Sequence, residues 1–162
     1  LYSMIQAIRE TNFNAYINTE ANRIDTSVTS AHIRHLVKFI NDLDEAVFYA
    51  YAALETINSR YTKLELSYNA VPDVFLGRLN LIPAGYYKYE LYEVSWIGSV
   101  SLTEDTAPDT ETDVLPVEDA NGVVQGLVAI GKLYLAEKAG SEEVQYTEYT
   151  PPATDNTIYY GQ

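Results

Sequence analysis

Alternation of apolar and polar residues at period two is the feature that most constrains this chain, because only an extended strand places every second side chain on one face. The pattern is clearest over residues 86–96, which are rich in strand-forming residues. It returns over residues 122–135, where Gly126 and Gly131 interrupt it as a β-bulge or a close backbone approach would require. Both segments predict strands, and they favour an all-β fold.

A corner motif stands directly before the first of these segments. It consists of Pro83, Gly85, Tyr87 and Tyr89 at alternate positions. The spacing matches the corner that leads into strand F of immunoglobulin-like sandwiches, where a tyrosine hydroxyl turns back onto upstream backbone and a cysteine follows two residues later. Tyr87 is then the corner tyrosine, and Tyr89 fills the cysteine position in a chain that has no cysteine. We predict a structural role for these four residues in an immunoglobulin-like or related β-sandwich.

The first half of the chain allows two interpretations. Residues 1–71 contain neither proline nor glycine, so the strongest local breakers do not divide them. The apolar positions of residues 31–54 fit one stripe of a helix, and they also fit two strands joined by a turn at Asn41 and Asp42. Near-alternation over residues 60–68 favours the strands. Residues 74–81 are also rich in strand formers, and we predict a strand there.

A polar stretch at residues 101–121 predicts a long, solvated acidic loop inside one domain. Its acidic residues are Glu104, Asp105, Asp109, Glu111, Asp113, Glu118 and Asp119. Clustered carboxylates can hold Ca²⁺, but the spacing of an EF-hand is absent. On a helix, His32 and His35 would share a face that can suit a metal, whereas on a strand they point to opposite faces and cannot bind one ion together. We interpret both as structural or surface histidines. We therefore predict no metal site and no cofactor.

Length and charge limit the partners. The 162 residues are enough for one globular domain, which we place at residues 1–150, followed by an extended C-terminal arm at residues 151–162. The 23 acidic residues against ten basic ones give a net charge of −13, which repels nucleic acid and anionic membrane surfaces. No apolar run approaches the roughly 20 residues of a membrane span. We expect neither direct nucleic-acid binding nor a membrane partner.

Motifs of the common catalytic classes are missing from the sequence. The chain has no Gly-x-Ser-x-Gly elbow, no Walker A loop and no dinucleotide-binding glycine fingerprint. Paired carboxylates could serve a glycosidase, but so acidic a chain offers many pairs and singles out none. We predict that the protein is not an enzyme.

Three segments resemble parts of small β-rich virion proteins of bacteriophages. They are NLIPAGYYKYELYEVSW at residues 80–96, KFINDL at residues 38–43 and GLVAIGKLYL at residues 126–135. The resemblance implies a structural protein of the virion, assembled in the host cytoplasm as a capsid-associated, neck or tail component. It implies other virion proteins, and copies of this chain, as partners.

The fifteen tyrosines suit such a role, because tyrosine supplies contact area at low entropic cost. We expect the arm to dock on a neighbouring subunit by strand addition, with Ile158, Tyr159 and Tyr160 as the contact residues. The alternative function is a carbohydrate- or surface-binding β-sandwich module. In that case exposed tyrosines and Trp96 would stack on sugars, and the acidic loop would hold Ca²⁺.

Overall fold

The computed structural model describes residues 4–138. This part of the chain consists of strands, three single-turn 3-10 helices and loops, so the predicted all-β class is confirmed. The arm at residues 151–162, with Ile158, Tyr159 and Tyr160, lies outside the described residues, as does the predicted domain end at residue 150. The strands are β1 (Met4–Ile8), β2 (Phe13–Ile17), β3 (Ile33–Asn41), β4 (Val47–Tyr51), β5 (Leu54–Ile57), β6 (Thr62–Tyr68), β7 (Arg78–Leu79), β8 (Gly85–Ser95) and β9 (Val123–Ala136). The 3-10 helices are η1 (Glu20–Asn22), η2 (Ser30–His32) and η3 (Val74–Leu76).

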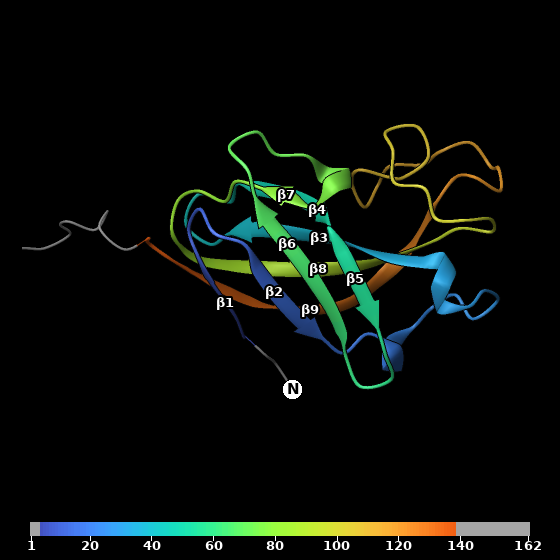
Figure 1. Ribbon diagram of the computed structural model, residues 1–162, viewed down its shortest axis with the longest axis horizontal. Coiled ribbons are helices and arrows are strands. Elements are labelled where there is room, and N and C mark those ends of the chain that lie inside the picture. Colours follow the sequence, from blue (N-terminus) through green and yellow to red (C-terminus); the bar gives the residue numbers. More distant parts are fainter. Residues whose placement is uncertain (1–3, 139–162) are drawn as a thin grey trace, which may run out of the picture.

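The strands form two sheets (Figure 1). One has the order β1-β9-β8-β3-β4, and the other has the order β2-β6-β5 with β7 beside β6. Neighbouring strands are antiparallel, except that β1 runs parallel to β9 and β7 parallel to β6. Strand β1 pairs only with the last part of β9, from Lys132 to Ala136.

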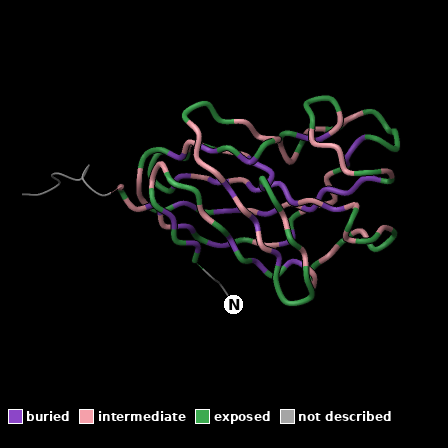
Figure 2. Tube along the Cα trace, viewed as in Figure 1, coloured by how far each residue is buried: buried purple, intermediate pink, exposed green. Residues whose placement is uncertain are grey.

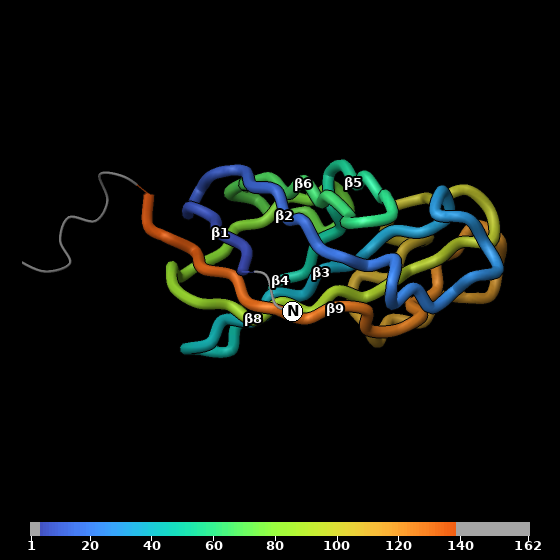
Figure 3. The backbone as a smooth tube through the Cα atoms, turned by 90° about the horizontal axis from the view of Figure 1, so that it is seen from below, coloured from blue at the N-terminus to red at the C-terminus, as the bar shows by residue number. Residues whose placement is uncertain are grey.

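Both sheets contribute to one hydrophobic core. Figure 3 shows β2, β5 and β6 along one side of the molecule and β3, β8 and β9 along the other. The core joins Leu64 and Leu66 of β6 to Val37 of β3 and Leu91 of β8. Figure 2 shows buried positions recurring along the strands, as expected where one face of each strand packs inward.

Residues 31–54 form strands, which settles the choice that the sequence left open. Strands β3 and β4 pair as an antiparallel hairpin. The side-chain oxygen of Asn41 accepts the backbone N–H groups of Leu43 at 2.8 Å and Asp44 at 3.1 Å. Asparagine favours turns through such bonds to its own backbone. The predicted turn at Asn41 and Asp42 is confirmed.

The predicted strand over residues 74–81 is wrong. The segment begins with η3, where the Asp73 carboxylate accepts the backbone N–H of Phe75 at 2.9 Å. Gly77 then takes a left-handed φ of 70°, and a Cβ at this position would lie 2.3 Å from the backbone nitrogen of Ala53. Only the two residues of β7 remain extended as a strand. A side-chain cap and a close backbone approach therefore override the strand propensity of this segment.

The alternation at residues 86–96 and 122–135 corresponds to β8 and β9, which pair from Gly85↔Leu135 to Ser95↔Val123 with two shifts in register. Gly126 has φ of 152° and faces Glu93 beside a shift in register, as in a bulge. Gly131 lies under the ring of Tyr89, because a Cβ there would lie 2.5 Å from that ring. Both glycine expectations are confirmed.

Candidate functional site

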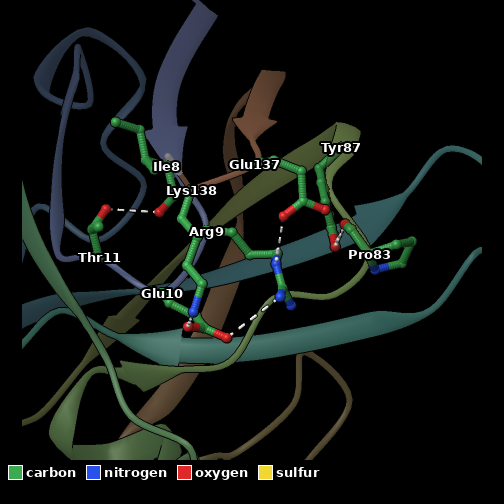
Figure 4. Close-up of polar contacts among 8 residues, drawn as sticks. All are labelled: Ile8, Arg9, Glu10, Thr11, Pro83, Tyr87, Glu137 and Lys138. Atoms are coloured by element: carbon green, nitrogen blue, oxygen red, sulfur yellow. Dashed lines mark hydrogen bonds and ion pairs between the residues drawn. The ribbon is translucent and has the colours of Figure 1, made fainter. Parts of the chain in front are cut away.

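The corner residues meet where the chain enters β8. The Tyr87 hydroxyl donates to the carbonyl oxygen of Pro83 at 2.7 Å, as drawn in Figure 4, and the Tyr87 ring is fully buried. Burial raises the pKa of Tyr87. Gly85 has φ of 133°, a conformation that favours glycine. Tyr89 lies in the core, with its ring against Gly131. These contacts fix the path of the chain into β8.

A cluster of ion pairs surrounds the end of β9 (Figure 4). The Arg9 guanidinium lies 3.0 Å from Glu137 and 3.4 Å from Glu10, and Lys138 lies 2.5 Å from Glu10. The hydrogen bond from Lys138 lowers the pKa of Glu10. Exposed ion pairs contribute little stability one by one, but together they hold the end of β9 against the turn between β1 and β2.

A groove of about 560 Å³ lies between β2 and β9, where the two sheets meet at one side of the molecule. Tyr16 is 52% exposed and Tyr61 is 41% exposed, and their rings meet edge to face at 5.5 Å. Arg60 is the one charged residue of the lining. The main lining residues are Tyr16, Asn22, Arg60, Tyr61, Val128 and Ile130.

One wall of this groove is an edge of β9. Within residues 4–138, no strand pairs with residues 127–131 on the side away from β8, because β1 begins its pairing at Lys132. The Asn22 amide donates to the carbonyl oxygen of Val128 at 3.1 Å. Ile130 beside it is 45% exposed. The segment that carries η1 therefore lies against this part of β9 and closes one end of the groove.

Hydrogen bonds and buried side chains hold the acidic loop against the domain, whereas the sequence predicts a solvated loop. The indole N–H of Trp96 donates to the Thr106 carbonyl at 3.1 Å, and the Tyr51 hydroxyl donates to the Pro108 carbonyl at 2.5 Å. Ala107 is fully buried beside these rings. The expectation of a fully solvated loop is therefore wrong for its middle part. Trp96 is 1% exposed, so it offers no face on which a sugar could stack.

Glu111 ties the same loop to the outer face of the first sheet. It accepts hydrogen bonds from the Lys38 ammonium at 2.6 Å and from the Tyr49 hydroxyl at 2.5 Å. Burial by itself would raise the pKa of Glu111, but these hydrogen bonds outweigh it and lower the pKa below its ordinary value. Burial and the bond to Glu111 raise the pKa of Tyr49 to about 12.

The remaining carboxylates of the loop do not gather as metal ligands. Burial raises the pKa of Asp109, and so do the hydrogen bond that its protonated form donates to the Asp113 carboxylate and the negative charge of that carboxylate. Over residues 4–138, no three acidic or histidine side chains are arranged so that they could hold an ion.

The two histidines have separate partners. The Nδ1 atom of His32 lies 2.6 Å from the Gly98 carbonyl. The Nδ1 atom of His35 lies 2.6 Å from the Glu55 carboxylate, which also accepts the His35 backbone N–H at 3.0 Å. This contact joins β3 of one sheet to β5 of the other.

A histidine beside a carboxylate is a common pair in acid–base catalysis. Here the side chains of His35 and Glu55 are only 3% and 1% exposed, so in this arrangement they hold the sheets together.

The buried carboxylate of Glu93 accepts the backbone N–H groups of Ile24 and Asp25 at 3.0 and 2.7 Å.

The groove was not visible in the sequence. The hydrogen bond between Asn22 and Val128 spans 106 residues, and no local pattern joins segments so far apart. The one usable signal was the high content of tyrosine, which indicates contact surfaces without locating them.

Comparison with protein-family models, with curated proteins and with solved structures finds no match to this chain. None of the helices within residues 4–138 is long and apolar enough to cross a membrane.

Proposed function

We propose that this protein is a structural subunit of a bacteriophage virion, which assembles with other virion proteins and with copies of itself and carries out no catalysis. The proposal rests on the resemblance of three segments to small virion proteins and on one structural observation. That observation is the groove between β2 and β9, with its two exposed tyrosines and its single arginine.

An immunoglobulin-like sandwich is the fold type that we propose for this subunit. In that fold, strands C, F and G form one sheet, strands B, E and D form the other, and variable-type domains add a strand beside C. The sheet β9-β8-β3-β4 follows the order G, F, C and the added strand, and the sheet β2-β6-β5 follows B, E and D. The bond from Tyr87 to Pro83 occupies the place of the tyrosine corner at the start of strand F. Strand order and corner together support the assignment.

The chemistry of the groove suits contact with another protein. Aromatic residues and arginine are enriched in protein interfaces, whereas acidic residues are depleted from interface cores. The groove has this composition, with two exposed tyrosines, one arginine and no carboxylate, although the whole chain is strongly acidic.

The net charge indicates where in the particle such a subunit belongs. A charge of −13 repels packaged nucleic acid. We therefore propose a place on the outer surface of the capsid, at the neck or in the tail, away from the genome.

The test is to infect host cells with a phage that encodes this chain and to purify the particles. Mass spectrometry should find the protein in stoichiometric amounts, and labelling followed by electron microscopy should locate it. Purified chain should also form oligomers in a concentration-dependent way. A chain that is absent from particles and stays monomeric at high concentration would contradict the proposal.

The exposed pair Tyr16 and Tyr61 also supports the alternative function, a carbohydrate-binding module. Tyrosine rings can stack on sugar faces in a groove of this size. Titration with a panel of glycans, followed by tyrosine fluorescence, tests it. Saturable binding that Tyr61→Ala abolishes, by a monomeric protein, would favour this function over assembly.

A further inference from the structure

We propose that the tip of the acidic loop, residues 114–117, is a docking surface for a different virion protein. The tip fits an apolar recess that is bordered by lysine or arginine residues. This inference rests on the proposed assembly function and names the surface that contacts the second kind of subunit.

Two valines make the tip the most exposed apolar part of the described chain. Val117 is 95% exposed and Val114 is 90% exposed, and no other large apolar side chain within residues 4–138 is as exposed as these two. Together with the two residues between them they form the apolar run VLPV. Single exposed apolar side chains are common on protein surfaces, whereas exposed apolar residues that gather in one place indicate a contact site.

Ile97 extends this apolar surface. It is 67% exposed and stands next to Gly98, whose backbone N–H donates to the carbonyl oxygen of Asp119 at 2.9 Å. This bond places the chain that leaves β8 beside the chain that leaves the tip. Figure 1 shows the loop between β8 and β9, in yellow and orange, at one end of the domain.

Hydrogen bonds hold the loop on both sides of the tip. Before the tip, Glu111 accepts the bonds from Lys38 and Tyr49. After it, the side-chain amide of Asn121 donates to the carbonyl oxygen of Pro116 at 2.8 Å. A loop that is already held in one arrangement loses less conformational entropy on binding, which favours affinity.

Charge indicates the chemistry of the partner. The acidic loop contains seven acidic residues and no basic one, and Glu111 is the only one of the seven in an ion pair within residues 4–138. Asp113 stands directly before the tip, and Glu118 and Asp119 stand directly after it. Protein interfaces combine an apolar centre with a polar rim of complementary charge. The recess on the partner is therefore expected to have a basic rim.

The same charges disfavour a second copy of this chain as the occupant. Another copy brings a net charge of −13 and an identical acidic loop. Like charges that face each other across an interface oppose binding. We therefore assign the tip to a different virion protein.

Photo-crosslinking in particles tests the contact directly. A phage that encodes this chain carries Val117→p-benzoylphenylalanine, and irradiation of its purified particles should link the chain to a different virion protein. Mass spectrometry should locate the link on an apolar segment beside lysine or arginine. The control is Leu43→p-benzoylphenylalanine, on the β3–β4 turn at the opposite end of the domain (Figure 3). Leu43 is 87% exposed, and it should give at least about tenfold less of this product.

A second measurement removes the apolar side chains of the tip. The double variant Val114→Ser and Val117→Ser should lower the amount of chain in particles at least about tenfold, because a few central anchors dominate most interfaces. Leu43→Ser should leave this amount unchanged. All three side chains are almost fully exposed, so both variants should unfold at the Tm of the wild type.

A charge reversal tests the expected basic rim. Glu118→Lys should lower the amount of chain in particles by at least about threefold, because it brings a positive charge to the rim of the recess. Glu45→Lys, at an exposed acidic residue of the β3–β4 turn, should have no effect.

Three results would overturn the inference. Links from Val117 that lead mainly to another copy, or to residues 139–162 of the same chain, give the tip a different occupant. Normal incorporation of the double valine variant excludes the tip as an anchor and leaves the proposed virion function intact. Particles that lack the wild-type chain refute the virion function, and the inference with it.

Discussion

The hydrogen bond from the Tyr51 hydroxyl is the contact that we expect to contribute most to the stability of the folded acidic loop. Tyr51 is fully buried, and it donates to the carbonyl oxygen of Pro108, itself buried next to Ala107. Tyr51→Phe keeps the ring and its stacking on Phe75 at 6.2 Å, so packing is preserved while one donor is lost. The Pro108 carbonyl is then left buried without this partner, which costs about 1–3 kcal/mol of unfolding free energy.

For a domain of this size, a loss of about 2 kcal/mol corresponds to a fall of roughly 4–8 °C in Tm. Urea denaturation followed by tryptophan fluorescence measures it directly, because the single tryptophan, Trp96, lies under the same loop and donates to Thr106. The matched control is Tyr86→Phe, which removes a hydroxyl from an exposed ring. If both variants unfold within about 0.5 kcal/mol of each other and the Trp96 emission is unchanged, the reasoning about the loop is refuted.

Three further predictions concern the corner, the core and the acid response. Tyr87→Phe should lower the free energy of unfolding by about 0.5–1.5 kcal/mol, which is less than the effect of Tyr51→Phe. The reason is that Pro83 is exposed, so water can replace the donor that its carbonyl loses. Thermal denaturation monitored by circular dichroism measures the change. Gly131→Ala should cost about 1–3 kcal/mol in the same assay, because its Cβ would overlap the buried ring of Tyr89, and a neutral result would show that the ring moves freely. The lowered pKa of Glu111 means that its stabilising contribution is present above its ordinary pKa of 4.5 and is lost as the pH falls through the lowered value. The wild type should therefore have a larger free energy of unfolding than Glu111→Gln at about pH 7, and this difference should shrink at about pH 3. Urea denaturation at the two pH values measures it. A difference that does not change with pH would contradict the ion pair.

Local patterns in the sequence determined the features that depend on near neighbours. The alternation at residues 86–96 and 122–135 predicted β8 and β9, and Asn41 predicted the turn that its own side chain stabilises. The corner bond joins residues only four positions apart. A signal within a few residues is sufficient in these cases because the interacting groups are themselves within a few residues.

The choice of partner strands was decided only in the tertiary structure. Residues 74–81 have strand propensity, yet they begin as a helical turn, and the left-handed Gly77 that ends this turn lies against the backbone of Ala53. Strands β1 and β2 stand in a part of the chain for which the sequence predicted no element, and β1 is fixed by parallel pairing with a strand at the other end of the chain.

The same reason explains the candidate site. Alternation of apolar and polar residues predicts which side chains share a face of a strand, but it does not predict which other strand will lie beside that face. The groove lies between β2 and β9, which belong to different sheets, and Trp96 is buried because the loop that follows it folds back over its ring. Composition and alternation thus determined an all-β, acidic, tyrosine-rich chain. The contacts between segments a hundred residues apart decided where on its surface the groove with the exposed tyrosines lies.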